Sequence, residues 1–242
     1  MWIRIVGARS AEQSVINTDG QVQKICDVFG MRDMLERFYP YEYADSVFAI
    51  DYEKLYALGY RGIIFDVDNT LVPLNADSTE EIDGLFRQIH AAGFRTVILS
   101  DNSEERVRRV LRNIDSPFIC RAGKPDPENF AKAVRMMRVG RDRAVVIGDQ
   151  IFMDIFGANR CGLASILVAF IRQPGETTFG KRRAAEEVIM SFYRRNPAMR
   201  HRIGDIRKED YTGKPPEKLR FREISPACRA VSMGMEKVFQ KF

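Results

Sequence analysis

The chain has few of the residues that build disulfide frameworks and zinc sites. Its 242 residues include two histidines and four cysteines, and the cysteines lie far apart, at Cys26, Cys120, Cys161 and Cys228. No CxxC pair occurs. Because both kinds of site need clustered thiolate or imidazole groups, neither is expected, and the cysteines are interpreted as reduced, structural thiols.

Long apolar runs are also missing. The longest, at residues 162–171, is much shorter than the roughly 18 residues that a membrane-spanning helix needs, and it suits a buried strand. The N-terminus lacks the basic and then apolar layout of a secretory signal, so a cytoplasmic location is expected.

Positive charge is concentrated toward the C-terminus. Residues 1–170 contain 21 Lys and Arg against 24 Asp and Glu, a net charge of −3, whereas residues 171–242 contain 17 against 9, a net charge of +8. The basic segment either meets an anionic partner or is simply solvated. It lacks the regular aromatic residues of a single-strand platform, so no specific nucleic acid is predicted.

Apolar runs alternate with amphipathic stretches between residues 62 and 171, the pattern of a parallel sheet flanked by helices. The sequence predicts an α/β fold with five strands, at 62–66, 95–100, 117–120, 144–148 and 163–169. The helices between them are predicted at 79–92, 103–113, 127–138 and 151–160. Asn102-Ser103 and Asp126-Pro127 are typical of helix starts and agree with this division.

The chain is expected to have three segments. Residues 1–30 form a poorly patterned N-terminal extension, and residues 31–171 form the core with its lead-in, including a short helix at 51–58. Residues 172–242 form a basic C-terminal extension with one amphipathic helix at about 181–195. That helix either packs on the sheet or lies on an anionic bilayer surface.

Two carboxylates follow the first predicted strand. In the run DVDNT at 66–70, Asp66 and Asp68 are two residues apart and would point to the same side of an ideal strand. Like charges so close together are costly unless a cation joins them or one stays protonated. A calcium loop of the EF-hand kind is excluded, because its sixth and twelfth positions need Gly and Glu and hold Leu71 and Asp77. A helix cap or a solvated turn is the alternative for a lone acidic pair.

Polar residues stand at the ends of the other predicted strands as well. They are Ser100 and Asp101 after the second strand, Lys124 after the third, and Asp149 and Asp154 in GDQIFMD after the fourth. Because the sheet is predicted to be parallel, these ends share one edge. Several acids without a nearby imidazole or thiolate suit a hard, oxygen-liganded cation such as Mg²⁺, and a lysine and a hydroxyl beside it suit a phosphoryl group.

Taken in order, DVDNT, Ser100, Lys124-Pro125 and GDQIFMD resemble the four motifs of the haloacid dehalogenase (HAD) superfamily. The resemblance implies a HAD-like Rossmannoid fold, a three-layer sandwich around the parallel five-stranded sheet. It implies that Asp66 is the nucleophile, which forms an aspartyl-phosphate, and that Asp68 is the general acid and base. Dehalogenases of the superfamily lack an acid at the position of Asp68, so its presence favours phosphate ester hydrolysis.

The resemblance also implies the binding groups. The phosphate-binding residues would be Ser100, Asp101 and Lys124, although the family more often has Asn at the position of Asp101. The Mg²⁺ ligands would be Asp66, Asp149 and the backbone carbonyl of Asp68, with Asp154 supporting the metal less directly.

No large cap domain is expected. Residues 73–99 have room for one helix and one strand, and residues 101–123 for one helix and a short strand. Because lids exclude water and enclose small substrates, a site without one suggests a large or surface-bound substrate.

A more specific resemblance is to the capless subclass IIIA phosphatases known as the YqeG family, over about residues 31–195. It is carried by MLERFYP at 34–40, FDVDNTLVP, SDN, RAGKP and GDQ followed by Asp154. Relatives include phosphatidylglycerophosphate phosphatases, so the resemblance implies an anionic phospholipid as substrate. The charge of the basic C-terminal segment fits such a substrate and predicts a peripheral contact with the inner membrane face. A phosphoprotein, a nucleic-acid end or a small phosphoester as substrate, and a non-catalytic binding scaffold, are the alternatives.

Overall fold

The computed structural model describes residues 31–171, 180–209 and 211–213. The chain divides into two units, residues 1–34 and 35–242, and the sheet and the site both belong to the second. The predicted N-terminal extension at 1–30 lies outside the described residues, as do residues 172–179, 210 and 214–242 of the predicted basic extension.

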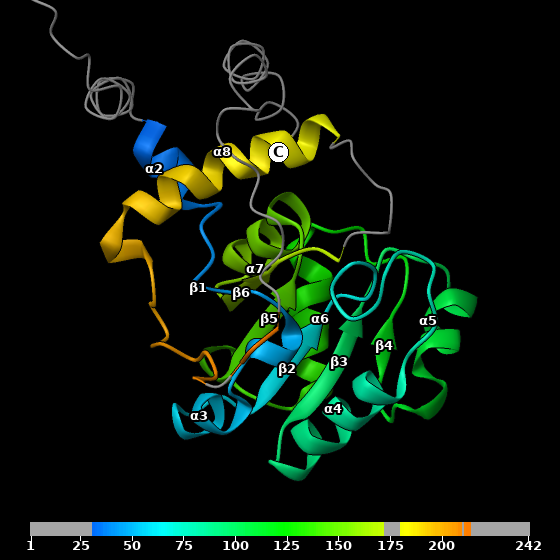
Figure 1. The fold of residues 1–242 in the computed structure, drawn as a ribbon. Helices are drawn as coiled ribbons and strands as arrows, with labels where there is room; N and C mark the ends of the chain where they lie inside the picture. The colour runs from blue at the N-terminus through cyan, green and yellow to red at the C-terminus, as the bar shows by residue number, and fades with distance from the viewer. Residues whose placement is uncertain (1–30, 172–179, 210, 214–242) are drawn as a thin grey trace, which may run out of the picture. The chain divides into compact units, whose positions relative to one another are not determined.

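A parallel sheet of six strands forms the centre of the second unit (Figure 1). Its strand order is β1-β6-β5-β2-β3-β4, and every neighbouring pair is parallel. The strands are β1 (Glu42–Ala44), β2 (Gly62–Phe65), β3 (Arg95–Leu99), β4 (Phe118–Ile119), β5 (Ala144–Gly148) and β6 (Ala164–Val168). All their carboxyl ends therefore lie at one edge of the sheet.

The sheet has one strand more than the predicted five. The additional strand is β1, which pairs with β6 at the sheet edge, with Glu42 opposite Ile166 and Ala44 opposite Val168. This strand was not predicted because it is only three residues long and begins with a glutamate, so the sequence shows no apolar run there. The strand forms because the edge of β6 offers it hydrogen-bonding partners, which is a tertiary effect.

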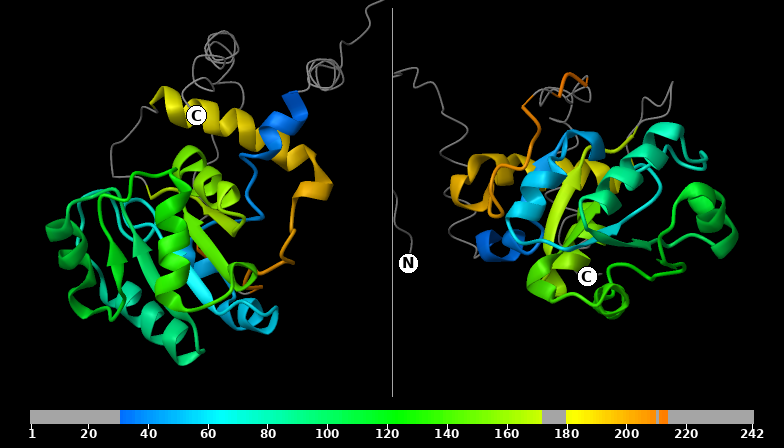
Figure 2. Two further views of the ribbon diagram at one scale, coloured as in Figure 1. Left: turned by 180° about the vertical axis from the view of Figure 1, so that it is seen from behind. Right: turned by 90° about the horizontal axis from the view of Figure 1, so that it is seen from below.

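Helices cover both faces of the sheet (Figures 1 and 2). The α-helices are α2 (Met31–Glu36), α3 (Tyr52–Ala57), α4 (Glu80–Ala91), α5 (Glu104–Val110), α6 (Pro127–Met137), α7 (Phe156–Arg160) and α8 (Lys181–Arg195). Short 3₁₀ turns occur at Val47–Ala49, Leu111–Asn113, Arg141–Arg143 and Pro197–Met199. Helices α3, α4 and α5 contribute to the core on one face, whereas α6 and α7 contribute to the core on the other.

The two cores follow from the alternation of side chains along the strands. In β2, Ile63 and Phe65 belong to the first core, where the Phe65 ring lies 5.1 Å from the Phe86 ring of α4. Ile64, between them, belongs to the second core together with Phe130 of α6. Because consecutive side chains of a strand point to opposite faces, an unbroken apolar run is the pattern of a strand buried on both sides. The predicted three-layer α/β sandwich is confirmed.

Two predicted helix starts are also confirmed. Ser103 accepts a hydrogen bond from Arg106 N at the start of α5, and Asp126 accepts one from Glu128 N at the start of α6. The predicted helix at 151–160 is in two parts, because Ile151–Ile155 is a π-helix and only the following residues are α-helical. Such π segments are often found at functional sites.

No cap domain interrupts the sheet. Between β2 and β3 the chain forms a loop and α4, and between β3 and β4 it forms α5 and a 3₁₀ turn. Among the described residues, no helix combines the length and the apolar character that crossing a bilayer requires.

Helix α8 buries its apolar side. Ala185, Ile189, Met190 and Tyr193 are all buried, and the Tyr193 ring lies 5.8 Å from the Tyr39 ring. The helix therefore packs on the protein, which was one of the two placements expected for it. Its apolar side is not available to a bilayer in this structure.

Candidate active site

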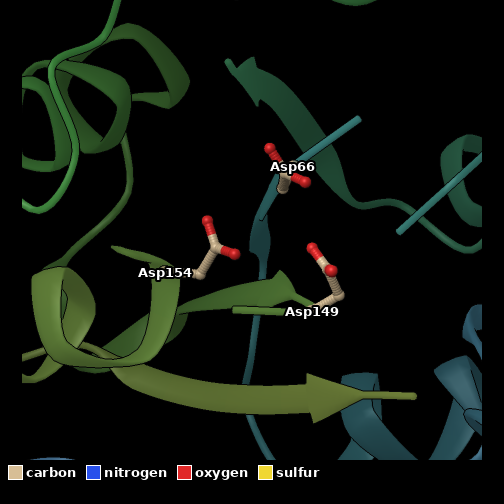
Figure 3. A group of neighbouring side chains, drawn as sticks. All are labelled: Asp66, Asp149 and Asp154. Atoms are coloured by element: carbon tan, nitrogen blue, oxygen red, sulfur yellow. The ribbon is translucent and has the colours of Figure 1, made fainter. Parts of the chain in front are cut away.

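Two neighbouring strand ends and the π-helix bring three acids together. Asp66 follows β2, Asp149 follows β5, and Asp154 lies in the π-helix. Each offers one carboxylate oxygen, and these oxygens all lie within 4.8 Å of one another. The three side chains are buried and point toward one another (Figure 3). This edge of the sheet is where ligands bind in open α/β folds.

The loop after β2 turns back toward these acids. Asn69 has a φ of 64°, a left-handed conformation that Asn adopts more readily than most residues, and its N–H donates to Val72 O at 2.7 Å. The turn places Thr70 Oγ1 3.1 Å from Asp66 Oδ2 and 3.1 Å from Asp149 Oδ1. The Thr70 hydroxyl therefore lies between the Asp66 and Asp149 carboxylates. Because it has a single proton, it donates to only one of the two carboxylates at a time.

Lys124 supplies a cation on the other side of Asp66. Its Nζ donates to Asp66 Oδ1 at 2.6 Å and to Asp154 Oδ1 at 2.8 Å, and its side chain is only 3% exposed. Burial acts to lower the pKa of Lys124, but the carboxylates of Asp154 and Asp66 outweigh it and raise the pKa above its ordinary value. Lys124 therefore stays charged. Its backbone N–H also donates to Asp101 Oδ1 at 3.0 Å, so Asp101 links the loops after β3 and β4.

The π-helix and a glycine allow Asp154 to reach the group. Gln150 N donates to Asp154 Oδ2 at 3.0 Å, so the side chain folds back over the end of β5. A side chain at Gly148 would collide with the Cβ, Cγ and Oδ2 of Asp154. Only a glycine at the end of β5 leaves room for this approach.

Asp68 has a different set of neighbours. Asn102 Nδ2 donates to Asp68 Oδ2 at 2.6 Å, and Arg106 donates to Asp68 Oδ1 at 2.7 Å. The same Asn102 Nδ2 lies 3.0 Å from the oxygen of the buried Ser100 hydroxyl. These contacts join the loop after β2 to the end of β3 and to α5. The Asp68 carboxylate is not part of the group of three acids.

Arg106 is buried with part of its hydrogen-bonding capacity unused. Its side chain is 8% exposed, and its Nε and one terminal nitrogen have no partner among the described residues. Buried guanidinium groups usually have all their donors satisfied. Its ion pair with Asp68 is therefore the interaction that compensates for burial.

Arg183 reaches the site from α8. It donates to the backbone oxygen of Asp149 at 2.6 Å and forms an ion pair with Asp149 Oδ2. Burial raises the pKa of Asp149 to about 8; Arg183 opposes this, and Asp66 and Asp154 add to it. Burial likewise raises the pKa of Asp154 to about 6, against the effect of Lys124.

Burial is the largest cause of both raised pKa values, and repulsion from the neighbouring carboxylates adds to it. A further cation bound between the carboxylates would relieve this repulsion. Three oxygen donors without imidazole or thiolate are the ligand set of a hard ion such as Mg²⁺. The residues therefore fit the predicted metal. Asp66 and Asp149 would hold it, and Asp154, which accepts from Lys124 and from Gln150 N, lies beside them, where the less direct role predicted for it stays a prediction.

The structure brings the predicted site residues to one edge of the sheet. Lys124, Asp149 and Asp154 meet at Asp66, and Ser100 is joined to Asp68 through Asn102. The role of the Asp68 carbonyl in metal binding and the role of Asp101 in phosphate binding stay predictions. Four further side chains contact these residues without having been predicted to belong to the site, namely Thr70, Asn102, Arg106 and Arg183. Thr70 and Asn102 belong to runs that were already noted, whereas Arg183 gives no signal in the sequence.

Comparison with known proteins identifies the family of the chain. A family model described as haloacid dehalogenase-like hydrolase matches residues 76–162. The probable phosphatase YqeG of Bacillus subtilis (strain 168) is 35% identical over 164 residues, which is 67% of this chain and 95% of that protein. The phospholysine phosphohistidine inorganic pyrophosphate phosphatase of Homo sapiens is 46% identical over 46 residues, 19% of this chain and 17% of that protein.

Among solved structures, a HAD family hydrolase from Deinococcus radiodurans R1 with bound phosphate and sodium has a TM-score of 0.43 and 15% identity, covering 55% of this chain and 89% of that one. The family assignment rests instead on the Bacillus subtilis relative, which is matched over almost its whole length. With that match, the chain belongs to the haloacid dehalogenase-like hydrolases and is a phosphatase of the YqeG-like family.

Proposed function

We propose that the chain is a Mg²⁺-dependent phosphomonoesterase that works through an aspartyl-phosphate on Asp66. The observation that carries the proposal is the position of the Asp66 carboxylate. It is buried, paired with Lys124 at 2.6 Å, and grouped with Asp149 and Asp154. Phosphoryl transfer depends mainly on such positioning and charge neutralisation.

In the first step a carboxylate oxygen of Asp66 attacks phosphorus, and the bond between phosphorus and the ester oxygen breaks. Asp68 gives its proton to the leaving oxygen. In the second step Asp68 takes a proton from water, whose oxygen attacks phosphorus and releases inorganic phosphate and the Asp66 carboxylate. Lys124 and Ser100 hold the phosphoryl oxygens. Mg²⁺, when bound, neutralises charge on the phosphoryl group.

The proposed substrate is a lipid phosphate such as phosphatidylglycerophosphate. The absence of a cap domain between β2 and β4 supports it, because the site is then open to a headgroup at a surface. The net charge of +8 in residues 171–242 supports attraction to anionic lipid. The proposed place of action is the inner face of the membrane, approached from the cytoplasm.

A phosphate-release panel tests the proposal. The full chain is incubated with Mg²⁺ and phosphatidylglycerophosphate, phosphatidic acid, a phosphopeptide or soluble sugar phosphates. Release from a lipid at a rate well above the others supports the lipid assignment, and preference for the phosphopeptide or a sugar phosphate overturns it. Asp66→Asn is expected to lose nearly all release from every substrate. Unchanged release by this variant would overturn the proposed nucleophile.

A further inference from the structure

Helix α8 contributes a residue to the metal-binding group although it lies outside the span that the family model matches. That span ends at residue 162, whereas Arg183 lies in the first turn of α8. Its guanidinium donates to both the backbone oxygen and a carboxylate oxygen of Asp149. Two donors of one planar guanidinium on one residue fix the orientation of that residue better than a single hydrogen bond does.

The guanidinium is itself held in place. Glu186, one turn further along α8, accepts from Arg183 at 2.9 Å, and it is buried. The other Glu186 oxygen lies 3.4 Å from the N–H of Phe152, in the π-helix. The Phe170 ring lies 4.8 Å from the guanidinium carbon. Arg183 is therefore restrained by α8, by the π-helix and by the residues after β6.

These contacts decide which part of Asp149 faces the other acids. Arg183 contacts Oδ2 and the backbone oxygen of Asp149. The other carboxylate oxygen, Asp149 Oδ1, faces Thr70, whose hydroxyl oxygen lies 3.1 Å from Asp149 Oδ1 and 3.1 Å from Asp66 Oδ2. Oδ1 is thus the oxygen directed toward Asp66. Partners that orient a ligating carboxylate in this way typically change metal affinity by about 10- to 100-fold.

We infer that Arg183 is the positioning residue for Asp149 in Mg²⁺ binding, and that α8 is thereby part of the phosphatase site. The inference rests on the proposed Mg²⁺-dependent function. Two alternative roles for Arg183 predict different effects of its removal. A guanidinium that competes with the cation would make Mg²⁺ binding tighter when it is removed, and one that only attaches α8 would change stability without changing Mg²⁺ affinity.

The test is a calorimetric titration of Mg²⁺ into the full chain. Arg183→Lys keeps the positive charge but loses the paired donors, and Glu186→Gln keeps Arg183 but loosens its hold. Arg194→Ala is the matched control, because Arg194 lies on the same helix, is exposed, and pairs only with Glu187 among the contacts described. We expect Arg183→Lys to weaken Mg²⁺ binding about 10- to 100-fold, Glu186→Gln to weaken it less, and Arg194→Ala to leave it within about twofold.

Phosphate release measured against Mg²⁺ concentration gives a second readout. Arg183→Lys and Glu186→Gln should need more Mg²⁺ for half-maximal release than the parent chain, and raised Mg²⁺ should restore most of the rate of Arg183→Lys. Unchanged or tighter Mg²⁺ binding by a folded Arg183→Lys variant would overturn the inference while leaving the proposed function intact. Normal Mg²⁺ binding by the parent chain without release of phosphate from any substrate would instead overturn the proposed function.

Discussion

Asp66 and Asp68 are two residues apart, but their carboxylates have different neighbours. Lys124 and Thr70 contact Asp66, whereas Asn102 and Arg106 contact Asp68. Two carboxyl groups in unlike surroundings can take unlike tasks in one reaction. Asp66 lies with the acids that suit a metal, as expected of the group that meets phosphorus. Asp68 is outside that group, and in the proposed mechanism it exchanges protons with the leaving group and with water.

The proposed proton-transfer role of Asp68 predicts a leaving-group effect. Asp68→Asn is expected to lower release from an alkyl phosphate by about 10²- to 10⁴-fold, because an alkoxide leaves poorly without a proton. With p-nitrophenyl phosphate the leaving group needs no proton, so a rapid burst of about one nitrophenol per chain should precede slow turnover as the aspartyl-phosphate accumulates. Rapid-mixing absorbance measures the burst. Equal losses on both substrates without a burst would contradict the assigned role.

The buried ion pair between Arg106 and Asp68 predicts an effect on stability. Arg106→Met removes one partner of a buried ion pair and should lower the free energy of unfolding by about 3 kcal/mol. The double variant Arg106→Met with Asp68→Asn should recover part of this loss, because no carboxylate is then left buried without its cation. Urea unfolding measures both. Arg108→Ala is the control, since its pair with Glu104 is exposed and should contribute less than about 1 kcal/mol.

His90 predicts a dependence of stability on pH. Its Nε2 lies 2.8 Å from Thr96 Oγ1, and burial lowers its pKa below 6.5 although Asp115 opposes the shift. The unfolded chain then binds more protons at position 90, so this contribution to stability is complete above the unfolded pKa and decreases as the pH falls through it. The stability difference between the parent and His90→Gln should shrink between about pH 7.5 and about pH 5. Urea midpoints that shift equally with pH in both would contradict this.

Secondary-structure elements differ in how much of them the sequence specifies. The strands β2 and β5 are predictable because they are buried on both faces and read as apolar runs. Helices α5 and α6 are predictable because Ser103 and Asp126 cap them. The strand β1 is not, because its pairing with β6 creates it.

The same distinction holds for the site. Acids at the ends of neighbouring strands are predictable from the parallel sheet alone, as for Asp66 and Asp149. The contribution of Arg183 depends on where α8 packs, and local sequence carries no information on that. The π-helix belongs to this second class, since it departs from the regular helix that the pattern at 151–160 indicates.

The close approach of Asp154 to Gly148 at the end of β5 predicts that adding a methyl group at Gly148 will disturb the site. Gly148→Ala should displace Asp154, because the added Cβ would meet its Cβ and carboxylate, and Lys124 would lose a partner. We expect weaker Mg²⁺ binding by about tenfold or more and a similar loss of phosphate release at low Mg²⁺. Gly84→Ala is the matched control. Gly84 lies within α4 and its added Cβ would have only an ordinary contact, so stability should rise by up to about 1 kcal/mol with unchanged release.

At the scale of the whole molecule, any contribution of α8 to the proposed membrane contact must come from charge. The apolar side of α8 is buried, so insertion of that side into a bilayer would require the helix to leave the protein. Lys181 and Arg182 at the start of α8 are exposed, as are Arg194 and Arg195 at its end. Each basic residue near an anionic surface contributes about 1 kcal/mol of attraction, and this attraction decreases with salt.

Vesicle co-sedimentation therefore has a defined expected outcome. The full chain should bind vesicles rich in anionic phospholipid at low salt and dissociate from them at about 1 M salt. It should not bind neutral vesicles. Lys181→Glu with Arg182→Glu should weaken the binding severalfold. The matched control is Lys132→Glu with Arg135→Glu, which makes the same change in net charge at exposed positions of α6. If the two double variants weaken vesicle binding equally, the attraction depends on net charge alone and α8 is not the membrane contact. Binding that persists at high salt, or that neutral vesicles share, would show an apolar contact and overturn the electrostatic one.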